Sequence, residues 1–236
     1  MQVLTADIPG KNNRIIMMGR QTGKTTLATL YILWYALFHK SKNIAVLANK
    51  AAQAAEILLR IKNAYIKLPL WLQQGLKKYN NSEILMETDT KIFAAASSSS
   101  SVRGKSIDLL LVDEFAFIDD NMATAFMQSV FPTQAAKKDA RMILISTPKG
   151  MNHFYEIWQK AKMGKNSFIP AKIQWWEVEG RDEAWKEKQI RDNGEKFFNQ
   201  EYACLLGTEN VEILNENGLK ETISLEELYI RQQESL

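Results

Sequence analysis

The sequence predicts an α/β fold in which a mostly parallel sheet is covered by helices on both faces. Short, continuous apolar runs rich in β-branched residues recur along the chain, as expected for strands buried on both sides. Longer segments with the length and periodicity of helices separate most of these runs. Strands that alternate with helices form a parallel sheet, because each crossover helix returns the chain to the same edge. The spacing does not give the order of the strands.

The predicted strands are short apolar runs that end at glycine, proline or polar residues. They are RIIMM (14–18), NIAVLAN (43–49), SEILME (82–87), KIFAAA (91–96), IDLLLVDE (107–114), RMILIST (141–147) and SFIPAKIQWW (167–176). SEILME and KIFAAA flank the polar tripeptide TDT, so we expect these two to pair as a hairpin.

The predicted helices are longer segments with good helix formers or an amphipathic pattern. They are residues 23–40, 50–68, 121–136, 151–164, 181–194 and 195–203. Pro69 marks a break, and the LPLWLQQGL stretch around it is expected to form a short additional helix. The segment that begins at residue 121 is expected to be helical at least as far as Pro132, and Gly164 is a C-terminal stop signal.

The composition sets limits on what the protein does. The formal net charge is +3, from 30 basic and 27 acidic residues, which gives no argument by itself for nucleic acid or membrane binding. The single cysteine, Cys204, forms no internal disulfide, in agreement with a reducing compartment. The most apolar run, residues 26–38, is too short to span a bilayer, and the N-terminus lacks the apolar core of a signal peptide.

The first chemical signal is MMGRQTGKTT (17–26), where a strand runs through a glycine-bearing loop into a helix. The backbone N–H groups of such a loop and the N-terminus of the next helix form a cradle for phosphates. Lys24 would reach the β- and γ-phosphates, and the Thr25 hydroxyl would bind Mg²⁺. The loop departs from the usual G-x-x-x-x-G-K-[ST] spacing, because its first glycine, Gly19, comes one residue late. The alternative is a strand–helix turn that carries Gly-Lys-Thr by chance.

The second signal is LLLVDEF (109–115), an apolar run followed by Asp113 and Glu114. A buried strand that ends in two carboxylates places both at the edge of the sheet where ligands bind in open α/β folds. Asp113 would hold Mg²⁺ through water, and Glu114 would orient and deprotonate the attacking water. Taken alone, such a pair is usually an ordinary strand end. When such a pair follows Gly-Lys-Thr within one domain, the pair predicts the second half of a nucleoside triphosphatase site.

The third signal is ILISTPKG (143–150), a strand that ends in two small hydroxyl residues, Ser146 and Thr147. Hydroxyls at this position can contact a γ-phosphate or its water. The alternative is a polar turn built around proline and glycine.

Taken in order, these signals resemble the large terminase subunit of tailed phages, and its T4-like branch most closely. The resemblance rests on GRQTGKTT, SVRGKSIDLLLVDEFAFI, ISTPKGMNHFYEIWQKAKMGKNSF and FFNQEYA, and it runs from about Ile15 to Ala203. That family has the same shortened phosphate loop, with Arg-Gln ahead of the variable residue and Gly-Lys-Thr. The resemblance implies a P-loop NTPase fold of the ASCE type and an ATP-driven motor that pushes DNA into a preformed capsid.

The resemblance also implies a role for each matching residue. Glu114 and Arg20 are expected to be catalytic, as the base and as the group that stabilises the γ-phosphate. Thr25 and Asp113 are expected to hold Mg²⁺. The residues expected to bind the nucleotide are Gly19, Gln21, Thr22, Gly23, Lys24, Thr25 and Thr26.

Further expectations depend on the resemblance alone. Ser146 and Thr147 match the element that couples hydrolysis to movement, and Arg103 in SVRG is a candidate phosphate sensor. The family has an adenine-reading segment before the loop and a nuclease domain after the motor domain. The chain is N-terminally short by comparison and ends before a nuclease domain, so we expect it neither to cut nor to package DNA alone.

The expected partners are those of a packaging motor in the host cytoplasm, with no membrane involved. They are double-stranded phage DNA, the portal protein, the small terminase subunit and further copies of the chain in a homo-oligomeric ring. The alternative within the same fold is an NTPase of the helicase or partition type. That alternative would need further motifs after residue 150, which we do not find.

The sequence changes character at Cys204. The segment 211–236 reads as a strand, an Asn-Glu-Asn-Gly turn, a second strand and a short helix capped by Ser224, with Glu227 three residues later. This pattern resembles the beginning of an intein, with the cysteine first and Gly207 three residues on. We therefore expect a terminase ATPase domain at 1–203 and an N-terminal intein fragment at 204–236.

The splice junction would be the bond between Ala203 and Cys204. The Cys204 thiolate would attack the Ala203 carbonyl and convert the peptide bond into a thioester. The later intein elements do not follow, so a matching C-terminal fragment that also carries the nuclease is expected on another chain. Three interpretations remain open: half of a split intein, an intein cut off by an incomplete gene, and an unusual terminase linker. In the first, the chain is a precursor for trans-splicing, and its ATPase could be silent until ligation.

Overall fold

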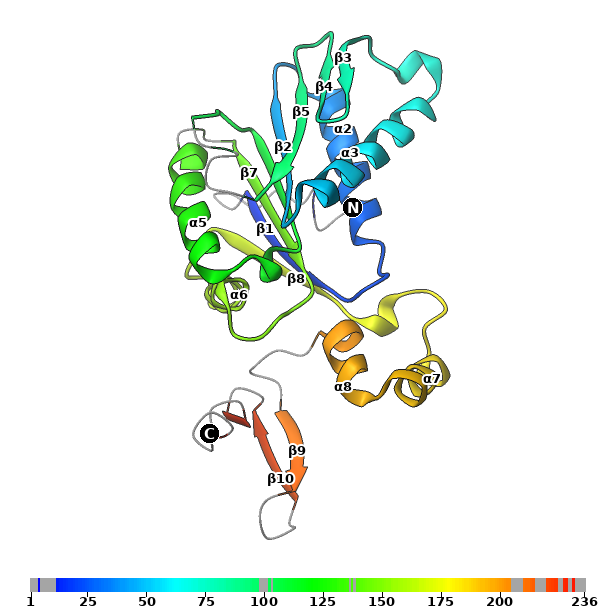
Figure 1. Ribbon diagram of the computed structural model, residues 1–236, viewed down its shortest axis with the longest axis vertical. Helices are drawn as coiled ribbons and strands as arrows, with labels where there is room; N and C mark the ends of the chain where they lie inside the picture. The colour runs from blue at the N-terminus through cyan, green and yellow to red at the C-terminus, as the bar shows by residue number, and fades with distance from the viewer. Residues whose placement is uncertain are drawn as a thin grey trace.

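The computed structural model describes residues 4, 12–97, 102, 104–135, 137, 139–204, 210–214, 220–224, 227–228 and 231 (Figure 1). Its main sheet has eight strands in the order β3-β4-β5-β2-β6-β7-β1-β8. The strands from β5 to β8 in this order are parallel, whereas β3 and β4 pair in antiparallel fashion. The bounds are β1 Asn13–Met18, β2 Asn43–Ala48, β3 Leu76–Asn80, β4 Glu83–Met86, β5 Lys91–Ala96, β6 Leu109–Asp113, β7 Arg141–Ser146 and β8 Phe168–Ile173.

Helices cover both faces of this sheet, as the sequence predicts. The residues of β1 alternate between two cores: Ile15 and Met17 face one, and Ile16 and Met18 face the other. Helices α2 and α3 pack into the core around Ile16, and α5 and α6 into the core around Ile15 (Figure 1). The bounds are α2 Lys24–Phe38, α3 Ala51–Ile66, α5 Asp120–Ala135 and α6 His153–Lys162. Burial on both sides explains why the central strands read as continuous apolar runs.

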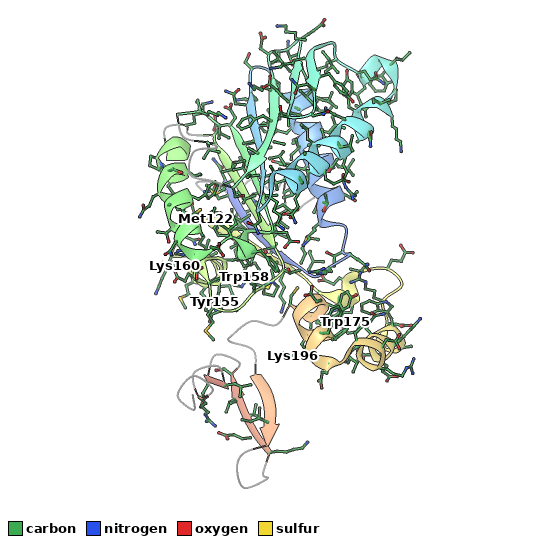
Figure 2. The ribbon with its side chains drawn as sticks, viewed as in Figure 1. Met122, Tyr155, Trp158, Lys160, Trp175 and Lys196 are labelled. Carbon is green, nitrogen blue, oxygen red and sulfur yellow. The ribbon has the colours of Figure 1, made fainter. Side chains whose placement is uncertain are left out.

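A small helical region follows β8 and has an aromatic cluster of its own. It contains the 3₁₀ turn η3 (Trp175–Glu177), α7 (Glu183–Asn193), α8 (Glu195–Phe198) and a π-helical turn, η4 (Asn199–Ala203). Trp175, labelled in Figure 2, is edge-on to Phe198 with ring centroids 5.6 Å apart. Trp185 stacks on Trp175 at 6.0 Å and is edge-on to Tyr202 at 5.1 Å. Aromatic packing therefore fixes the turn that leads to Cys204.

The segment after Cys204 forms a separate two-stranded sheet. Strands β9 (Asn210–Leu214) and β10 (Lys220–Ser224) are antiparallel, with Lys220 opposite Leu214. Beyond β10, the backbone N–H of Glu227 donates to the Ser224 hydroxyl at 3.1 Å, the contact that the capping pattern predicts. The two strands predicted for the tail are thus confirmed. The predicted turn between them and Gly207 lie outside the described residues.

Some local elements differ from the sequence prediction. The additional helix after Pro69 is only a 3₁₀ turn, η1 (Leu70–Leu72), and β8 ends at Ile173, where η3 soon follows. The single helix expected at 195–203 is divided into α8 and the π-helical turn. Strand β3 was not predicted, because its sequence LKKYN is polar and mostly exposed at the sheet edge and shows no apolar alternation. Among the described residues, no helix is long and apolar enough to cross a membrane.

Candidate nucleotide site

The predicted site residues meet at one edge of the sheet because of the strand order. Strand β7 lies between β1 and β6, so the ends of all three strands are adjacent. The phosphate loop follows β1, the acidic pair stands at the end of β6, and Ser146 ends β7. The predicted fold class, an α/β fold with a mostly parallel sheet covered by helices on both faces, is confirmed.

The phosphate loop is held by its own hydrogen bonds and by two left-handed residues. Gln21 has φ 55° and Gly23 has φ 82°, and a positive φ at the second position favours glycine. The Thr22 hydroxyl donates to the Gly19 carbonyl at 2.8 Å, which closes the loop. Gly23 precedes the first residue of α2, so the N-terminus of that helix faces the loop. This is the geometry of a phosphate cradle.

Lys24 and the acidic pair are in direct contact. The Lys24 ammonium forms an ion pair with Oε1 of Glu114. Glu114 has a left-handed backbone, with φ 54° and ψ 40°, and its N–H donates to Oδ1 of Asp113 at 3.1 Å. The other oxygen, Glu114 Oε2, is buried and accepts no hydrogen bond from any described residue. A strained residue with an unsatisfied buried oxygen is typical of a site that acts on a ligand or water.

The electrostatics of Asp113 also distinguish it from an ordinary strand end. Burial and the neighbouring Glu114 carboxylate raise the pKa of Asp113 to about 6, and the Lys24 ammonium offsets only part of this. A nearby cation would stabilise the ionised form of such a carboxyl group. Mg²⁺ is commonly held by one or two carboxylates together with phosphates, which is the chemistry that the Asp113 carboxylate offers.

The two hydroxyls at the end of β7 are buried next to the site. Ser146 Oγ accepts a hydrogen bond from the backbone N–H of Ala116 at 3.1 Å, just after Glu114. Thr147 is 2% exposed. Neither hydroxyl lines the cavity at the loop, so β7 is connected to the site through the turn that carries Glu114.

A cavity of about 420 Å³ opens in front of the loop. It is lined by Arg20, Gln21, Lys24, Asn49, Gln53, Glu114 and Phe117. Sequence reasoning missed Asn49, Gln53 and Phe117. The first of these follows β2 directly, so its place after a parallel strand was the available signal. Asn49 Nδ2 donates to the Phe117 carbonyl at 3.2 Å and joins two walls of the cavity.

The remaining predicted residues lie as follows. Arg20 lines the cavity, and its Nε forms an ion pair with Glu201, which sequence reasoning did not single out. Thr26 is exposed in the first turn of α2. Arg103 lies outside the described residues. Cys204 is fully buried.

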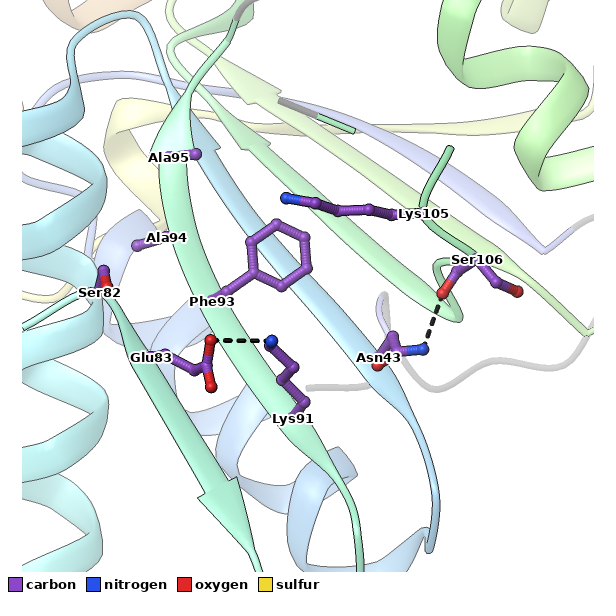
Figure 3. A pocket seen from close by; sticks show the side chains of 9 residues that line it. All are labelled: Asn43, Ser82, Glu83, Lys91, Phe93, Ala94, Ala95, Lys105 and Ser106. Atoms are coloured by element: carbon purple, nitrogen blue, oxygen red, sulfur yellow. Dashed lines mark hydrogen bonds and ion pairs between the residues drawn. The ribbon is translucent and has the colours of Figure 1, made fainter. Parts of the chain in front are cut away.

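A second cavity, of about 400 Å³, lies on β5 and contains none of the predicted residues (Figure 3). Its polar groups are paired with one another: Lys91 with Glu83 at 2.8 Å, and Asn43 Nδ2 with the Ser106 carbonyl at 2.9 Å. Lys105 lies 4.5 Å from the centroid of the Phe93 ring. The phosphate-loop cavity, with its unsatisfied carboxylate oxygen, is therefore the better candidate site.

Comparison with known proteins gives the family and the fold. Residues 15–220 match the family model of the terminase large subunit, T4likevirus-type, N-terminal. The fold is similar to the large terminase ATPase domain of Thermus phage P74-26, with 20% identity, a TM-score of 0.63, and 81% of this chain and 87% of that chain covered. It is also similar to the large terminase of bacteriophage HK97, with 18% identity, a TM-score of 0.72, and 89% and 50% covered.

A third similar structure is the large terminase of a thermophilic bacteriophage in complex with ATP-gamma-S. The identity is 14%, the TM-score is 0.66, and 89% of this chain and 53% of that chain are covered. The chain thus spans about half the length of the HK97 protein and of this third protein. The family match covers most of the chain and both halves of the predicted site. The chain therefore belongs to the T4-like family of terminase large subunits and carries the N-terminal part of such a subunit.

Proposed function

We propose that residues 1–203 form the Mg²⁺-dependent ATPase domain of a phage DNA-packaging motor. The observation that carries this proposal is the ion pair between Lys24 and Glu114, whose N–H is bonded to Asp113. Lys24 directly follows a phosphate loop in which two residues have a positive φ. The large terminase of the thermophilic bacteriophage has been solved with ADP and with ATP-gamma-S, which supports nucleotide as the ligand of this fold. The family match decides against the helicase or partition alternative.

The residues of the chain would divide the reaction as follows. The loop N–H groups and Lys24 bind the phosphates, and Lys24 leaves Glu114 to do so. Glu114 then orients a water at its buried Oε2 side and accepts its proton as that water attacks the γ-phosphate. Thr25 and Asp113 would hold Mg²⁺, which would neutralise charge on the phosphates.

Arg20 would stabilise charge on the γ-phosphate from the loop side. Arginines in this role increase turnover by about 10³- to 10⁵-fold. Gln21, Thr22, Gly23 and Thr26 complete the nucleotide cradle, and Arg103 is a further candidate sensor. Ser146 and Thr147 would couple hydrolysis to movement, through the hydrogen bond from the Ala116 N–H that ties β7 to the turn of Glu114.

DNA translocation belongs to the whole motor, of which this chain is a part. We propose double-stranded phage DNA, the portal protein and the small terminase subunit as partners, with several copies of the subunit in a ring in the host cytoplasm. The family match and the similarity to packaging proteins support this assignment.

The ATPase proposal is tested on the full-length or ligated large subunit. We expect Mg²⁺-dependent ATP hydrolysis that Glu114→Gln lowers by about 10²- to 10⁴-fold. Unchanged turnover in this variant would remove Glu114 as the base. As a control, Glu83→Gln changes an acid that is paired with lysines in the other cavity, and it should leave turnover unchanged.

For the second part of the chain, we propose that residues 204–236 are the N-terminal fragment of a split intein. The support is the antiparallel hairpin β9–β10, the capping contact of Glu227 on Ser224, and the place of Cys204 directly after the π-helical turn η4. Arg231 adds ion pairs to Glu221 and Glu227 and ties the segment after β10 to the hairpin.

The first chemical step would be an acyl shift at the junction. Sγ of Cys204 bonds to the carbonyl carbon of Ala203, the Ala203–Cys204 C–N bond breaks, and the thiol proton ends on the released amine of Cys204. A matching C-terminal fragment, joined to the nuclease domain, would complete the ligation. The alternative is a terminase linker without splicing activity, which the extension of the family match to residue 220 favours.

Peptide mapping of the large subunit from infected cells separates these two alternatives. A linker leaves the tryptic peptide FFNQEYACLLGTENVEILNENGLK intact in the mature protein. Splicing instead joins FFNQEYA to a residue other than Cys204, and Cys204→Ala abolishes that joined peptide. The intact peptide in the mature subunit, with no joined product, contradicts the intein proposal.

A further inference from the structure

The conformation of Glu114 is tied to the short turn that follows it. Glu114 has a left-handed backbone, with φ 54°, and it directly precedes the 3₁₀ turn η2 (Phe115–Phe117). The Phe117 N–H donates to the Glu114 carbonyl at 2.9 Å, so the turn closes on Glu114 itself. A glutamate with a positive φ persists only where surrounding contacts fix it. The placing of this carboxylate therefore depends on what holds η2.

Asn152, in the loop after β7, holds η2 by its backbone. Its Nδ2 donates to the Ala116 carbonyl at 2.7 Å and to the Lys149 carbonyl at 2.9 Å. The Ala116 N–H donates to the Ser146 hydroxyl, so both polar backbone groups of this buried residue are bonded to side chains from one segment. A buried carbonyl that loses its donor is unfavourable. Loss of the Asn152 amide would therefore favour a rearrangement of η2.

The other end of the same amide group caps α6. Asn152 Oδ1 accepts hydrogen bonds from the N–H groups of Phe154 and Tyr155, at 3.1 Å and 3.4 Å. Phe154 packs in the same core as Phe115 of η2. An asparagine side chain carries both an acceptor and a donor on one short stem. Asn152 thus joins the start of α6 to the turn of Glu114.

We propose that Asn152 is a positioning residue that keeps Glu114 aligned for the attack of water on the γ-phosphate. The proposal rests on the proposed ATPase function, in which Glu114 is the base. Without the Asn152 amide, η2 relaxes, Glu114 leaves its left-handed conformation more easily, and its carboxylate is less often directed at the water. Asn152 is not among the residues that line the cavity, so phosphate binding by the loop and Lys24 stays as it is. The loss therefore falls on kcat and not on KM.

Asn152→Asp separates the two uses of the amide group. Aspartate keeps an oxygen that caps α6, but it has no N–H group to donate to the Ala116 carbonyl. In the full-length or ligated large subunit, we expect kcat for ATP to fall about tenfold, the effect of one lost hydrogen bond, and KM to change by less than about twofold. Asn152→Ser also caps the helix and adds no charge, so it should give the same fall in kcat.

Asn166 is a matched control, since it uses its amide in the same two ways just after α6. Its Nδ2 donates to the Ile157 carbonyl at 2.9 Å, and its Oδ1 accepts from the Phe168 N–H at 3.1 Å. Asn166→Asp removes an equivalent donor from the same helix without touching η2. It should lower the thermal midpoint to a similar extent as Asn152→Asp and leave kcat unchanged. An equal loss of kcat in both variants would reflect stability alone and would overturn the proposal.

A double-variant cycle shows whether Asn152 acts through Glu114. In a Glu114→Gln subunit, held in excess over ATP, Asn152→Asp should cause no further fall in the residual turnover. A further fall of the same size would give Asn152 an independent role and would overturn the proposal. If the original subunit hydrolyses no ATP, or if Glu114→Gln leaves turnover intact, the proposed ATPase function fails and this inference fails with it. Hydrolysis that depends on Glu114 but not on Asn152 would overturn this inference alone.

Discussion

Lys24 and Glu114 form an ion pair at the phosphate loop, although 90 positions separate them in the sequence. Both belong to the proposed reaction, the first as a phosphate ligand and the second as the base. In this arrangement each side chain neutralises the other. In the proposed reaction, Glu114 would therefore activate water only after a phosphate replaces it at the lysine.

The ion pair predicts opposite effects of Glu114→Gln on binding and on hydrolysis. Removal of the carboxylate frees the Lys24 ammonium, so the dissociation constant for ATP-gamma-S should fall by about tenfold, near the value of one charge-assisted contact. Turnover should be lost in the same variant. Calorimetric titration and a phosphate-release assay measure the two quantities. Weaker binding in the Glu114→Gln chain would contradict the competition between Glu114 and phosphate.

Asp113 is expected to destabilise the folded chain at neutral pH. Its pKa is raised from 3.8 to about 6 by burial and by Glu114, so the folded state binds this proton more tightly than the unfolded state. The protonated Asp113 therefore contributes to the free energy of unfolding at low pH, and this contribution is lost as the pH rises from about 4 to about 6. Asp113→Asn should raise the free energy of unfolding at pH 7 by up to about 3 kcal/mol.

The matched control for this prediction is Asp108→Asn, which should have the opposite sign. Burial acts to raise the pKa of Asp108, but the Asn43 N–H and the Lys137 ammonium together lower it below its ordinary value. This group contributes stability above its unfolded pKa, and that stability is lost as the pH falls through the folded pKa. Thermal unfolding at pH 5 and pH 7.5 measures both variants. A destabilised Asp113→Asn chain at pH 7.5 would show that burial does not control this carboxyl.

Gly19→Ala should damage the loop by steric conflict with backbone. The new Cβ would meet the Tyr202 carbonyl at 2.8 Å, and the backbone of η4 has to move to relieve this contact. Overpacking of this kind costs about 1–3 kcal/mol. Gly75→Ala is the control, since the three atoms nearest to its Cβ all belong to the carboxyl group of the exposed Glu87 side chain, which can rotate away. Denaturant unfolding compares the two, and equal stability would show that η4 does not restrain the loop.

Arg181→Lys should weaken nucleotide binding more than it changes the chemical step. The guanidinium donates to the carbonyls of Arg20 and Gln21 and also lies over Trp185. A lysine ammonium does not reproduce this planar geometry, so the loop should lose its fixed shape. We expect KM for ATP to rise about tenfold while kcat changes by less than about threefold. The reverse pattern would place Arg181 in the chemical step.

The sequence was sufficient for the parts of the site that follow parallel strands. Lys24 after β1, Asp113 at the end of β6 and Ser146 at the end of β7 are adjacent because parallel strands end at the same edge. Residues without such a local signal were missed. Glu201 and Arg181 reach the loop from positions more than 150 residues away. Glu201 lies in the FFNQEYA stretch, but nothing in that stretch indicates contact with the loop, and Arg181 belongs to no recognisable motif.

The sequence also did not predict the unusual backbone conformations near the site. The positive φ of Glu114 and Cys204 is unusual for these residue types and is imposed by tertiary contacts. The π-helical turn before Cys204 lies in a segment with an ordinary helical pattern, and the aromatic cluster of Trp175 and Tyr202 fixes it there.

Lys24, Asp113 and Glu114 are proposed to form a site for Mg²⁺ and ATP. Calorimetric titration of the chain with Mg²⁺ and ATP-gamma-S, in the original sequence and in Lys24→Ala, measures whether they do. We expect saturable binding with one nucleotide per chain and a loss of affinity of about a hundredfold in the variant, as for removal of a charged phosphate ligand. Equal affinity of the two chains would contradict the assignment of Lys24 as a phosphate ligand.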